Sequence, residues 1–274
     1  MFKIIIMALL IFIGMVGYDN ITDKAQPTTP VQQEQQKTSK HEKSAAMALF
    51  TSLLPPKEEW PSPVHKFYLA FNMDEVIDPI RQNPNWTSLD AMSRDIPQAL
   101  IAIEDHAFYN HGAIAVEGIL RAALANINAG EVVQGGSTLT QQFVKNVFLS
   151  HEQSMERKIE EAVLSLMLED NYSKDEILEL YLNTTYFGAG STGIKQASRT
   201  YFGKAPSALT LAEAAVIASL PYAPTSLNPL ENPEGCKKRQ LLVLAAMHKY
   251  GMINQGQLAE AKAEKIRLTN GIVM

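Results

Sequence analysis

The feature that most constrains the fold is a succession of helical patterns separated by capping and glycine signals. Apolar residues at helical or continuous spacing occupy 97–103, 114–129, 153–170, 174–182, 211–220, 233–250 and 255–265. Gly130 follows the second pattern as a C-terminal cap. Ser173 with Glu176, and Thr210 with Glu213, have the spacing of capping boxes. No alternating strand pattern of any length and no internal repeat is found, so the sequence predicts a mainly α domain.

Composition limits the partners and the number of domains. The chain has 274 residues, of which 46% are hydrophobic, enough for one sizeable core and a small accessory lobe. A formal net charge of −5 gives no global indication of nucleic acid binding. The single cysteine, Cys236, can form neither an internal disulfide nor a multi-cysteine zinc site, and we expect a structural thiol.

The N-terminal segment is apolar from Ile4 to Tyr18, after Lys3. Fifteen residues fall short of the roughly 20 that span a bilayer comfortably, and they overlap the length of a signal-peptide core. Because no small-x-small cleavage site follows, we expect residues 1–18 to be an uncleaved anchor, although cleavage remains open. Residues 19–48, rich in Gln, Thr, Lys, Glu and Pro, are expected to form a flexible linker, and 49–274 a globular domain.

The first polar constellation is EDHAFYNHG, from Glu104 to Gly112. A carboxylate that follows the apolar run ALIAI lies at the edge of buried surface, where desolvation raises its pKa and makes it a useful base near neutral pH. Asp105 and His111 could orient or tune it. The alternative is a helix that ends in solvated charges, with Phe108 in the core, and composition alone favours that alternative.

The second constellation is QGGSTLTQQFVKN, from Gln134 to Asn146. Its two glycines let the backbone approach a ligand, while Ser137 and Thr138 can cap the helix that follows. A helix N-terminus exposes N–H groups and partial positive charge that suit a phosphate. Thr138, Gln142 and Lys145 share a helical face, but an ordinary glycine loop before a well-capped helix is equally compatible with the pattern.

The third constellation is RKIEE, from Arg157 to Glu161. Arg157 and Lys158 precede Glu161 by four and three residues, which usually indicates a surface ion pair of about 0.3–0.5 kcal/mol. The functional alternative is a second carboxylate held by cations that also meet an anionic leaving group. The six histidines show no HExxH arrangement, although a divalent ion bridging a diphosphate would need only one protein carboxylate.

Taken in order, five segments resemble glycosyltransferase family 51, the peptidoglycan glycosyltransferases found alone or at the N-terminus of bifunctional penicillin-binding proteins. The segments are IEDHAFYNHG, QGGSTLTQQFVKN, RKIEEAVLSLMLE, YSKDEILELYLNTTYFG and LAEAAVIASLPYAPTSLNP. They occur in the family's order and cover roughly residues 86–261. Five motifs in register are far more specific than any one of them.

The resemblance implies a mainly α fold with a lysozyme-like large lobe and a smaller, membrane-facing jaw lobe. It implies polymerisation of lipid II into β-1,4 glycan strands with release of undecaprenyl diphosphate, on the extracytoplasmic side of the cell membrane. The expected partners are lipid II, the growing lipid-linked strand, the membrane and other cell-wall synthesis proteins, without nucleic acid. A loosely bound Mg²⁺ or other divalent cation is expected, and no organic cofactor.

Site residues follow from the motifs and the resemblance together. Glu104 matches the general base, and Glu161 a second essential carboxylate that could also contact the metal. The positions expected to contact or support substrate are Asp105, Phe108, His111, Ser137, Thr138, Gln142, Lys145, Asn146, Arg157 and Lys158.

The first motif departs from the family pattern at Ala107, Ala113 and Ala115, which bears on loop geometry and rate. No SxxK segment with a downstream KTG is present, so we expect a monofunctional enzyme. Two alternatives stay open: a lytic glycosidase, since a lysozyme-like fold with carboxylates is compatible with cleavage, and a catalytically weak scaffold.

Overall fold

Ten α-helices and three short 3-10 turns form the part of the protein that the computed structural model describes, residues 68–69, 72–130, 135–149 and 154–274. These residues contain no strand, only two isolated bridges, so the mainly α prediction is confirmed. The predicted anchor, 1–18, and linker, 19–48, lie outside the described residues, as does the start of the predicted domain 49–274. The division into a large lobe and a jaw lobe stays a prediction.

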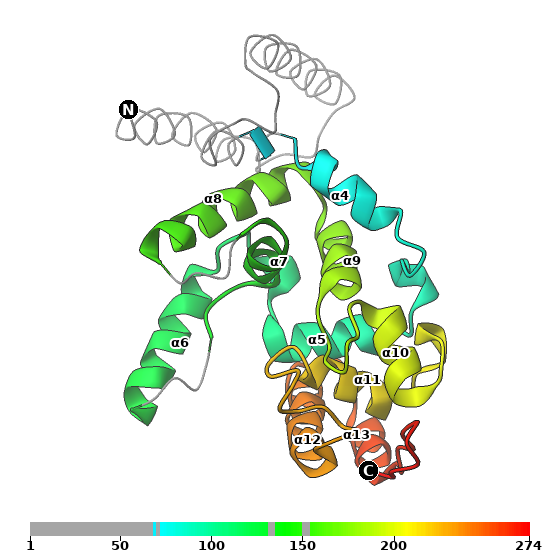
Figure 1. The fold of residues 1–274 in the computed structure, drawn as a ribbon. Coiled ribbons are helices and arrows are strands. Elements are labelled where there is room, and N and C mark those ends of the chain that lie inside the picture. Colours follow the sequence, from blue (N-terminus) through cyan, green and yellow to red (C-terminus); the bar gives the residue numbers. More distant parts are fainter. Residues whose placement is uncertain (1–67, 70–71, 131–134, 150–153) are drawn as a thin grey trace, which may run out of the picture. The chain divides into compact units, whose positions relative to one another are not determined.

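The helices are labelled in Figure 1. They are α4 (Asp74–Arg81), α5 (Asp95–Glu104), α6 (Val116–Ala129), α7 (Leu139–Phe148), α8 (Met155–Asn171), α9 (Lys174–Thr184), α10 (Ile194–Phe202), α11 (Leu211–Ser219), α12 (Pro233–Lys249) and α13 (Gln255–Ala263). Two of them, α4 and α10, were not predicted. Both are short, α4 contains a proline, and α10 is enclosed by Gly193 and Gly203, so neither gives a long apolar period.

Side-chain caps set most helix starts where the sequence indicated them. The capping boxes at Ser173 and Thr210 are present, and Gly130 ends α6 with φ of 70°, a left-handed conformation that glycine adopts without strain. Two further capping boxes begin at Thr138, before α7, and at Asn254, before α13. The cap of α7 fixes where that helix begins next to the first motif.

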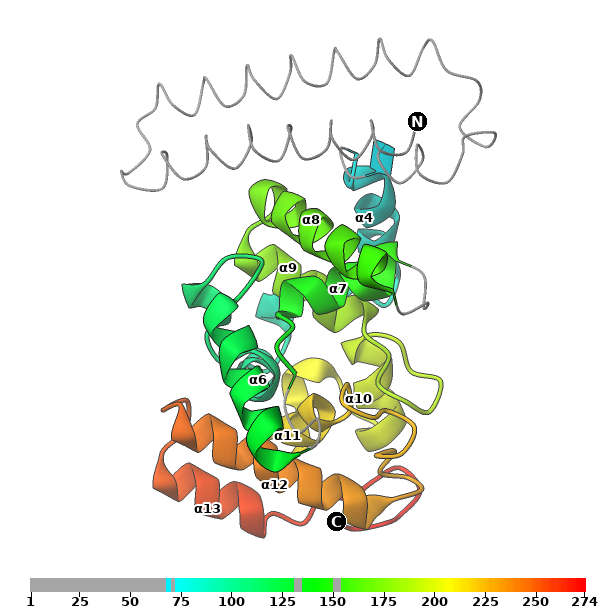
Figure 2. The ribbon, with the colours of Figure 1, turned by 90° about the vertical axis from the view of Figure 1, so that its left-hand side faces the viewer.

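The core is organised around α11, whose residues from Ala212 to Ser219 are all buried. This helix packs against α5 and α12, while α7 packs against α8 and α9. Figures 1 and 2 both place α8 and α12 on opposite sides of α7 and α11. Glu104 therefore ends a helix of the first group, and the second motif opens a helix of the other.

Cys236 lies in the interface between α11 and α12 and is fully buried. Its sulfur is 3.8 Å from the Oγ atom of Ser219, and burial raises the pKa of the thiol to about 11. A protonated thiol without solvent contact is a poor nucleophile, which agrees with the expected structural role. Across the described segments, every helix is too short or too polar to cross a bilayer.

Candidate active site

Glu104 is the last residue of α5 and is held by a chain of two hydrogen bonds. The Nε2 atom of Gln142, on α7, donates to its Oε2 atom at 2.9 Å. The hydroxyl of Tyr181, on α9, donates to the Oε1 atom of Gln142 at 3.0 Å. Because the hydroxyl of Tyr181 donates to the amide oxygen of Gln142, the amide nitrogen of Gln142 faces Glu104. Tyr181 itself is fully buried.

The electrostatic surroundings of Glu104 suit a base. Burial raises the pKa of this carboxyl above its ordinary value, as the sequence predicted. The hydrogen bond from Gln142 and the positive charges of Arg239 and Lys145 oppose that rise, and the negative charge of Asp105 adds to it. The carboxylate is thus desolvated but faces two cations, a combination found where a proton must be accepted near neutral pH.

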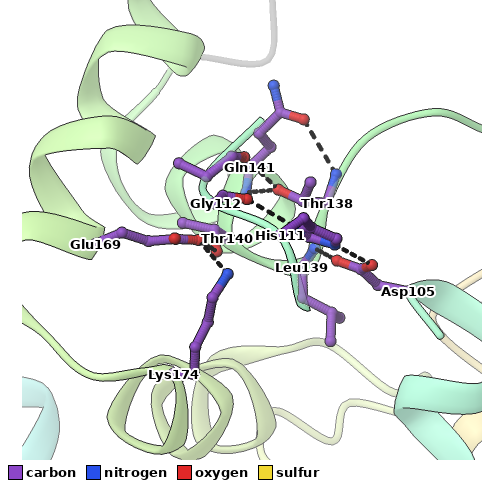
Figure 3. A network of polar contacts seen from close by, with 10 residues as sticks. Asp105, His111, Gly112, Thr138, Leu139, Thr140, Gln141, Glu169 and Lys174 are labelled. Carbon is purple, nitrogen blue, oxygen red and sulfur yellow. Dashed lines mark hydrogen bonds and ion pairs between the residues drawn. The ribbon is translucent and has the colours of Figure 1, made fainter. Parts of the chain in front are cut away.

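Asp105 ties the first motif to the second, as Figure 3 shows. Its Oδ2 atom accepts the backbone N–H of Leu139 at 3.0 Å, and its Oδ1 atom lies 2.6 Å from Nε2 of His111. The Nδ1 atom of His111 donates to the carbonyl of Gly112 at 2.6 Å. Asp105 thus contacts both the loop of the first motif and the first residue of α7.

This contact bears on the phosphate site at the N-terminus of α7, which the sequence left open as one of two alternatives. Leu139 is the first residue of α7, so the carboxylate of Asp105 already occupies the positive end of that helix. The carboxylate of Asp105 therefore holds the first motif against the second. A substrate diphosphate at this end of α7 would have to share it with the carboxylate of Asp105.

Thr138 caps α7, as the sequence indicated it could, and its hydroxyl is turned inward. Only 1% of the residue is exposed, and the hydroxyl donates to the carbonyl of Ala113 at 2.8 Å while accepting the N–H of Gln141 at 3.1 Å. Its role is to cap α7 and to hold the loop after the first motif. Because the acceptor at Ala113 is a backbone atom, the departure from the family pattern at that position leaves this contact intact.

The third motif contains an ion pair between a buried carboxylate and an exposed ammonium, whereas its spacing suggested a pair entirely on the surface. Glu161 is 2% exposed and pairs with the ammonium of Lys158, not with Arg157 four residues before it. The same ammonium donates to the Oγ atom of Ser137 at 3.1 Å, which connects α8 to the start of the second motif. The Nε atom of Arg157 is buried and has no hydrogen-bond partner among the described atoms.

The remaining candidates divide between the core and the surface. Phe108 is fully buried, with the ammonium of Lys174 4.5 Å from its ring centroid, so it supports the loop from below. Lys145 and Asn146 are exposed at the second half of α7. The structure therefore brings together Glu104, Asp105, His111 and Gln142, and separately Ser137, Lys158 and Glu161.

Several residues near this site were not found from the sequence. Tyr181 and Arg239 act on Glu104 or its partner from α9 and α12, and no local spacing links them to the first motif. Figure 3 also shows Glu169 accepting from Thr140 and Lys174, at 2.6 Å each. That cluster joins α7, α8 and α9 beneath the loop.

A dedicated metal centre does not fit these residues. In the described ranges, no group of three or more His, Cys, Asp or Glu side chains converges on one point. The carboxylate of Glu161 is already paired with Lys158. The expected divalent cation stays a prediction that would depend on oxygen atoms of the substrate.

Comparison with known proteins identifies the family. The family model described as "Transglycosylase" matches residues 73–248. A Cupriavidus necator protein named "Putative transglycosylase H16_A0665" is 41% identical over 194 residues, which cover 71% of this chain and 84% of that protein. Penicillin-binding protein 1A of Neisseria flavescens is 44% identical over 185 residues, 68% of this chain and 23% of that protein.

Among solved structures, a crystal structure of Penicillin-Binding Protein 1A from Haemophilus influenzae matches with 33% identity and a TM-score of 0.34, over 48% of this chain and 16% of that chain. The chain spans about a quarter of the length of the penicillin-binding proteins that it matches. The family model itself covers more than half of the chain and contains Glu104, the second motif and the third. The chain therefore belongs to the transglycosylase family, the peptidoglycan glycosyltransferases of glycosyltransferase family 51.

Proposed function

We propose that this chain polymerises lipid II into β-1,4 glycan strands and releases undecaprenyl diphosphate on the outer side of the cell membrane. The observation that carries the proposal is the carboxylate of Glu104, which burial and the Gln142–Tyr181 hydrogen-bond chain prepare as a base. Family membership supplies the reaction class, and the lipid-linked substrate and its product are our inference.

The reaction is one displacement at the anomeric carbon of the donor N-acetylmuramic acid. Glu104 accepts the proton of the acceptor's 4-hydroxyl as that oxygen forms the new bond to the anomeric carbon. The bond from this carbon to the diphosphate oxygen breaks, and its electron pair leaves with undecaprenyl diphosphate. Attack opposite the leaving group converts an α-linked donor into a β-linked product, and positioned proton transfer contributes about 10²–10⁴-fold.

Cations of α7 and α8 stabilise the negative charge that develops on the leaving group. Lys145 is exposed and acts on the same space as Glu104, and Arg157 has an Nε–H that no described atom accepts. An ammonium has three donors, and Lys158 places two of them on Ser137 and Glu161, which leaves one for an anionic oxygen. These cations supply positive charge in addition to the N-terminus of α7, where Asp105 already binds one N–H group.

A divalent cation such as Mg²⁺ remains part of the proposal only as a partner of the substrate diphosphate, near Glu161. The described carboxylates do not assemble a metal site of their own. Titration with Mg²⁺ and with a chelator during turnover measures its contribution directly.

Membrane contact follows from a lipid-linked substrate and from exposed apolar side chains. On α6, Val116, Leu120, Leu124 and Ile127 are 60–76% exposed and recur every three or four residues, so they form one stripe. On α8, Met155 and Ile159 are 79% and 61% exposed. We propose that these side chains contact the bilayer that holds lipid II, in addition to the anchor predicted for residues 1–18.

The test uses the full chain in mild detergent with fluorescent lipid II, with Glu104→Gln and with Glu234→Gln as an exposed-carboxylate control. The wild type and Glu234→Gln should produce a glycan ladder that a muramidase collapses to disaccharide units, and Glu104→Gln should lose most of it. A full ladder from Glu104→Gln would reject its assignment as the base. Release of muropeptides from purified sacculi would favour a lytic enzyme, and lipid II binding without a ladder would favour a scaffold.

A further inference from the structure

An exposed aromatic ring, Tyr222 of the fifth segment, and an arginine, Arg239, lie together, and neither was among the site residues expected from the sequence. Arg239, on α12, has its Cζ atom 4.1 Å from the ring centroid of Tyr222, in the segment between α11 and α12. Tyr222 is 66% exposed, unusually high for so large an aromatic residue. One face of the ring is therefore covered by a guanidinium, and the side chain otherwise meets solvent.

The hydrogen-bonding capacity of Arg239 is unused within the described structure. Its Nε atom is buried and has no hydrogen-bond partner there, and no described carboxylate lies within ion-pair distance of its guanidinium. Buried donors without partners are rare in native proteins and require an explanation. This guanidinium stacks on an aromatic ring, and its N–H donors have no partner among the described residues. It can therefore bind a ligand that offers oxygen atoms.

Arg239 approaches the base from a helix other than those that carry the leaving-group cations. α12 packs against α5, which ends at Glu104, and α8, which carries Arg157 and Lys158, lies across α7 from it in Figures 1 and 2. The positive charge of Arg239 acts on Glu104 from α12, as that of Lys145 does from α7. The donor and the acceptor must both reach Glu104. Because the cations proposed to bind the donor's leaving group lie on α7 and α8, the α12 side is the one left for the acceptor.

We infer that Tyr222 and Arg239 form a subsite for the acceptor sugar, with the ring of Tyr222 packed against the apolar face of the pyranose and Arg239 donating to its oxygen substituents. This assignment rests on the proposed function, since it presumes that Glu104 deprotonates a sugar hydroxyl. A pyranose ring presents C–H groups on its faces and polar groups on its edge, which suit the uncovered face of the Tyr222 ring and the N–H donors at the edge of the Arg239 guanidinium. The acceptor hydroxyl must also reach hydrogen-bonding distance of the base.

The experiment separates the two substrates chemically, in the full chain. A lipid II blocked at the 4-hydroxyl of its N-acetylglucosamine serves only as donor, and a lipid II with a non-cleavable phosphonate at the anomeric carbon serves only as acceptor. Their single coupling is followed with a labelled donor, for the wild type, Tyr222→Ala, Tyr222→Phe, Arg239→Gln, Arg239→Lys and the exposed control Lys238→Ala. Thermal unfolding of each variant confirms that it is folded.

Tyr222→Ala and Arg239→Gln should each raise the KM for the acceptor about tenfold and leave the KM for the donor within about twofold. Tyr222→Phe and Lys238→Ala should behave like the wild type. An unchanged acceptor KM in Tyr222→Ala, or equal increases for donor and acceptor, would overturn the subsite. Absence of any coupling by the wild type would instead reject the proposed function itself.

The pH profile gives a second readout that a purely structural role would not move. The charged and titratable groups around Glu104 are Arg239 from α12, Lys145 from α7, Tyr181 from α9 and the adjacent Asp105. Loss of the positive charge in Arg239→Gln should raise the pKa of Glu104, so the acid limb of the coupling rate should move to higher pH. Arg239→Lys should keep the limb in place while still raising the acceptor KM. A limb that does not move in Arg239→Gln contradicts the placement of this side chain beside the base.

Discussion

At the scale of single residues, the amide of Gln142 determines how Glu104 works. It is fixed at both ends, by the carboxylate that it donates to and by the hydroxyl of Tyr181 that it accepts from. A hydrogen bond to an ionised carboxylate stabilises the charged form, which counteracts part of the effect of burial. The base is consequently buried enough to be reactive and still ionises.

Gln142→Leu should therefore raise the pKa of Glu104 further and move the acid limb of the turnover rate to higher pH. The sign follows because the base acts in its deprotonated form, and a higher pKa leaves less of that form at low pH. The maximal rate should fall by about 10–100-fold, the worth of a hydrogen bond to a charged group. The rate–pH profile with lipid II measures both.

Tyr181→Phe provides the matched control for that prediction. It removes only the hydroxyl that orients the amide, so it should shift the limb in the same direction by a smaller amount. A larger effect of Tyr181→Phe than of Gln142→Leu would contradict the order of this hydrogen-bond chain.

At the scale of helices, the cap of α7 holds the first two motifs together. The hydroxyl of Thr138 caps the helix and donates to the carbonyl of Ala113, and Asp105 binds the next N–H. Thr138→Ala removes both contacts of the hydroxyl and leaves a buried carbonyl without its donor. The free energy of unfolding should fall by about 1–3 kcal/mol, whereas Thr138→Ser should cost less. Urea denaturation followed by circular dichroism measures the difference, and an equal loss in both variants would point to the methyl group instead.

The start of α6 lacks the cap that α7 has. Ala115 is its N-cap residue and supplies no side-chain hydrogen bond, which is the physical meaning of that departure from the family pattern. Ala115→Ser or Ala115→Asp should stabilise the protein by about 0.5–2 kcal/mol. A rise in Tm without a change in lipid II turnover is the expected result. A fall in Tm would show that the backbone there cannot accept a capping side chain.

Features that depend on residues close together in the sequence were predicted, and features that depend on distant residues were not. Capping boxes and Gly130 act within one turn, and the helices that they bound were predicted to within about two residues at most ends. The contact of Asp105 with Leu139 joins residues 34 apart, and no local pattern could show that it fills the N-terminus of α7. Spacing alone likewise could not decide which cation of the third motif pairs with Glu161, nor that Arg239 approaches from α12.

At the scale of the whole molecule, the exposed apolar stripe of α6 bears on how the enzyme reaches its substrate. Leu124, in that stripe, is 64% exposed, and Leu242 on α12 is 55% exposed. In this proposal Leu124 lies at the bilayer, and Leu242, on another helix and outside the stripe, serves as the comparison.

A tryptophan introduced at each position tests this placement in the full chain reconstituted into vesicles. Brominated phospholipids should quench the added fluorescence of Leu124→Trp and leave that of Leu242→Trp nearly unchanged, each measured against the parent protein. Equal quenching at both positions, or none at either, would reject α6 as the membrane-contacting helix.

The buried cysteine, Cys236, can report when the interface between α11 and α12 opens. Cys236 is the only cysteine in the chain, it has no solvent contact, and its thiol is protonated at neutral pH because burial raises its pKa to about 11. A maleimide can therefore react only during excursions that separate α11 from α12, so the labelling rate counts those excursions without any engineered site. If bound substrate slows the labelling of Cys236, the ratio of the two labelling rates measures how much less often the interface opens in the occupied enzyme.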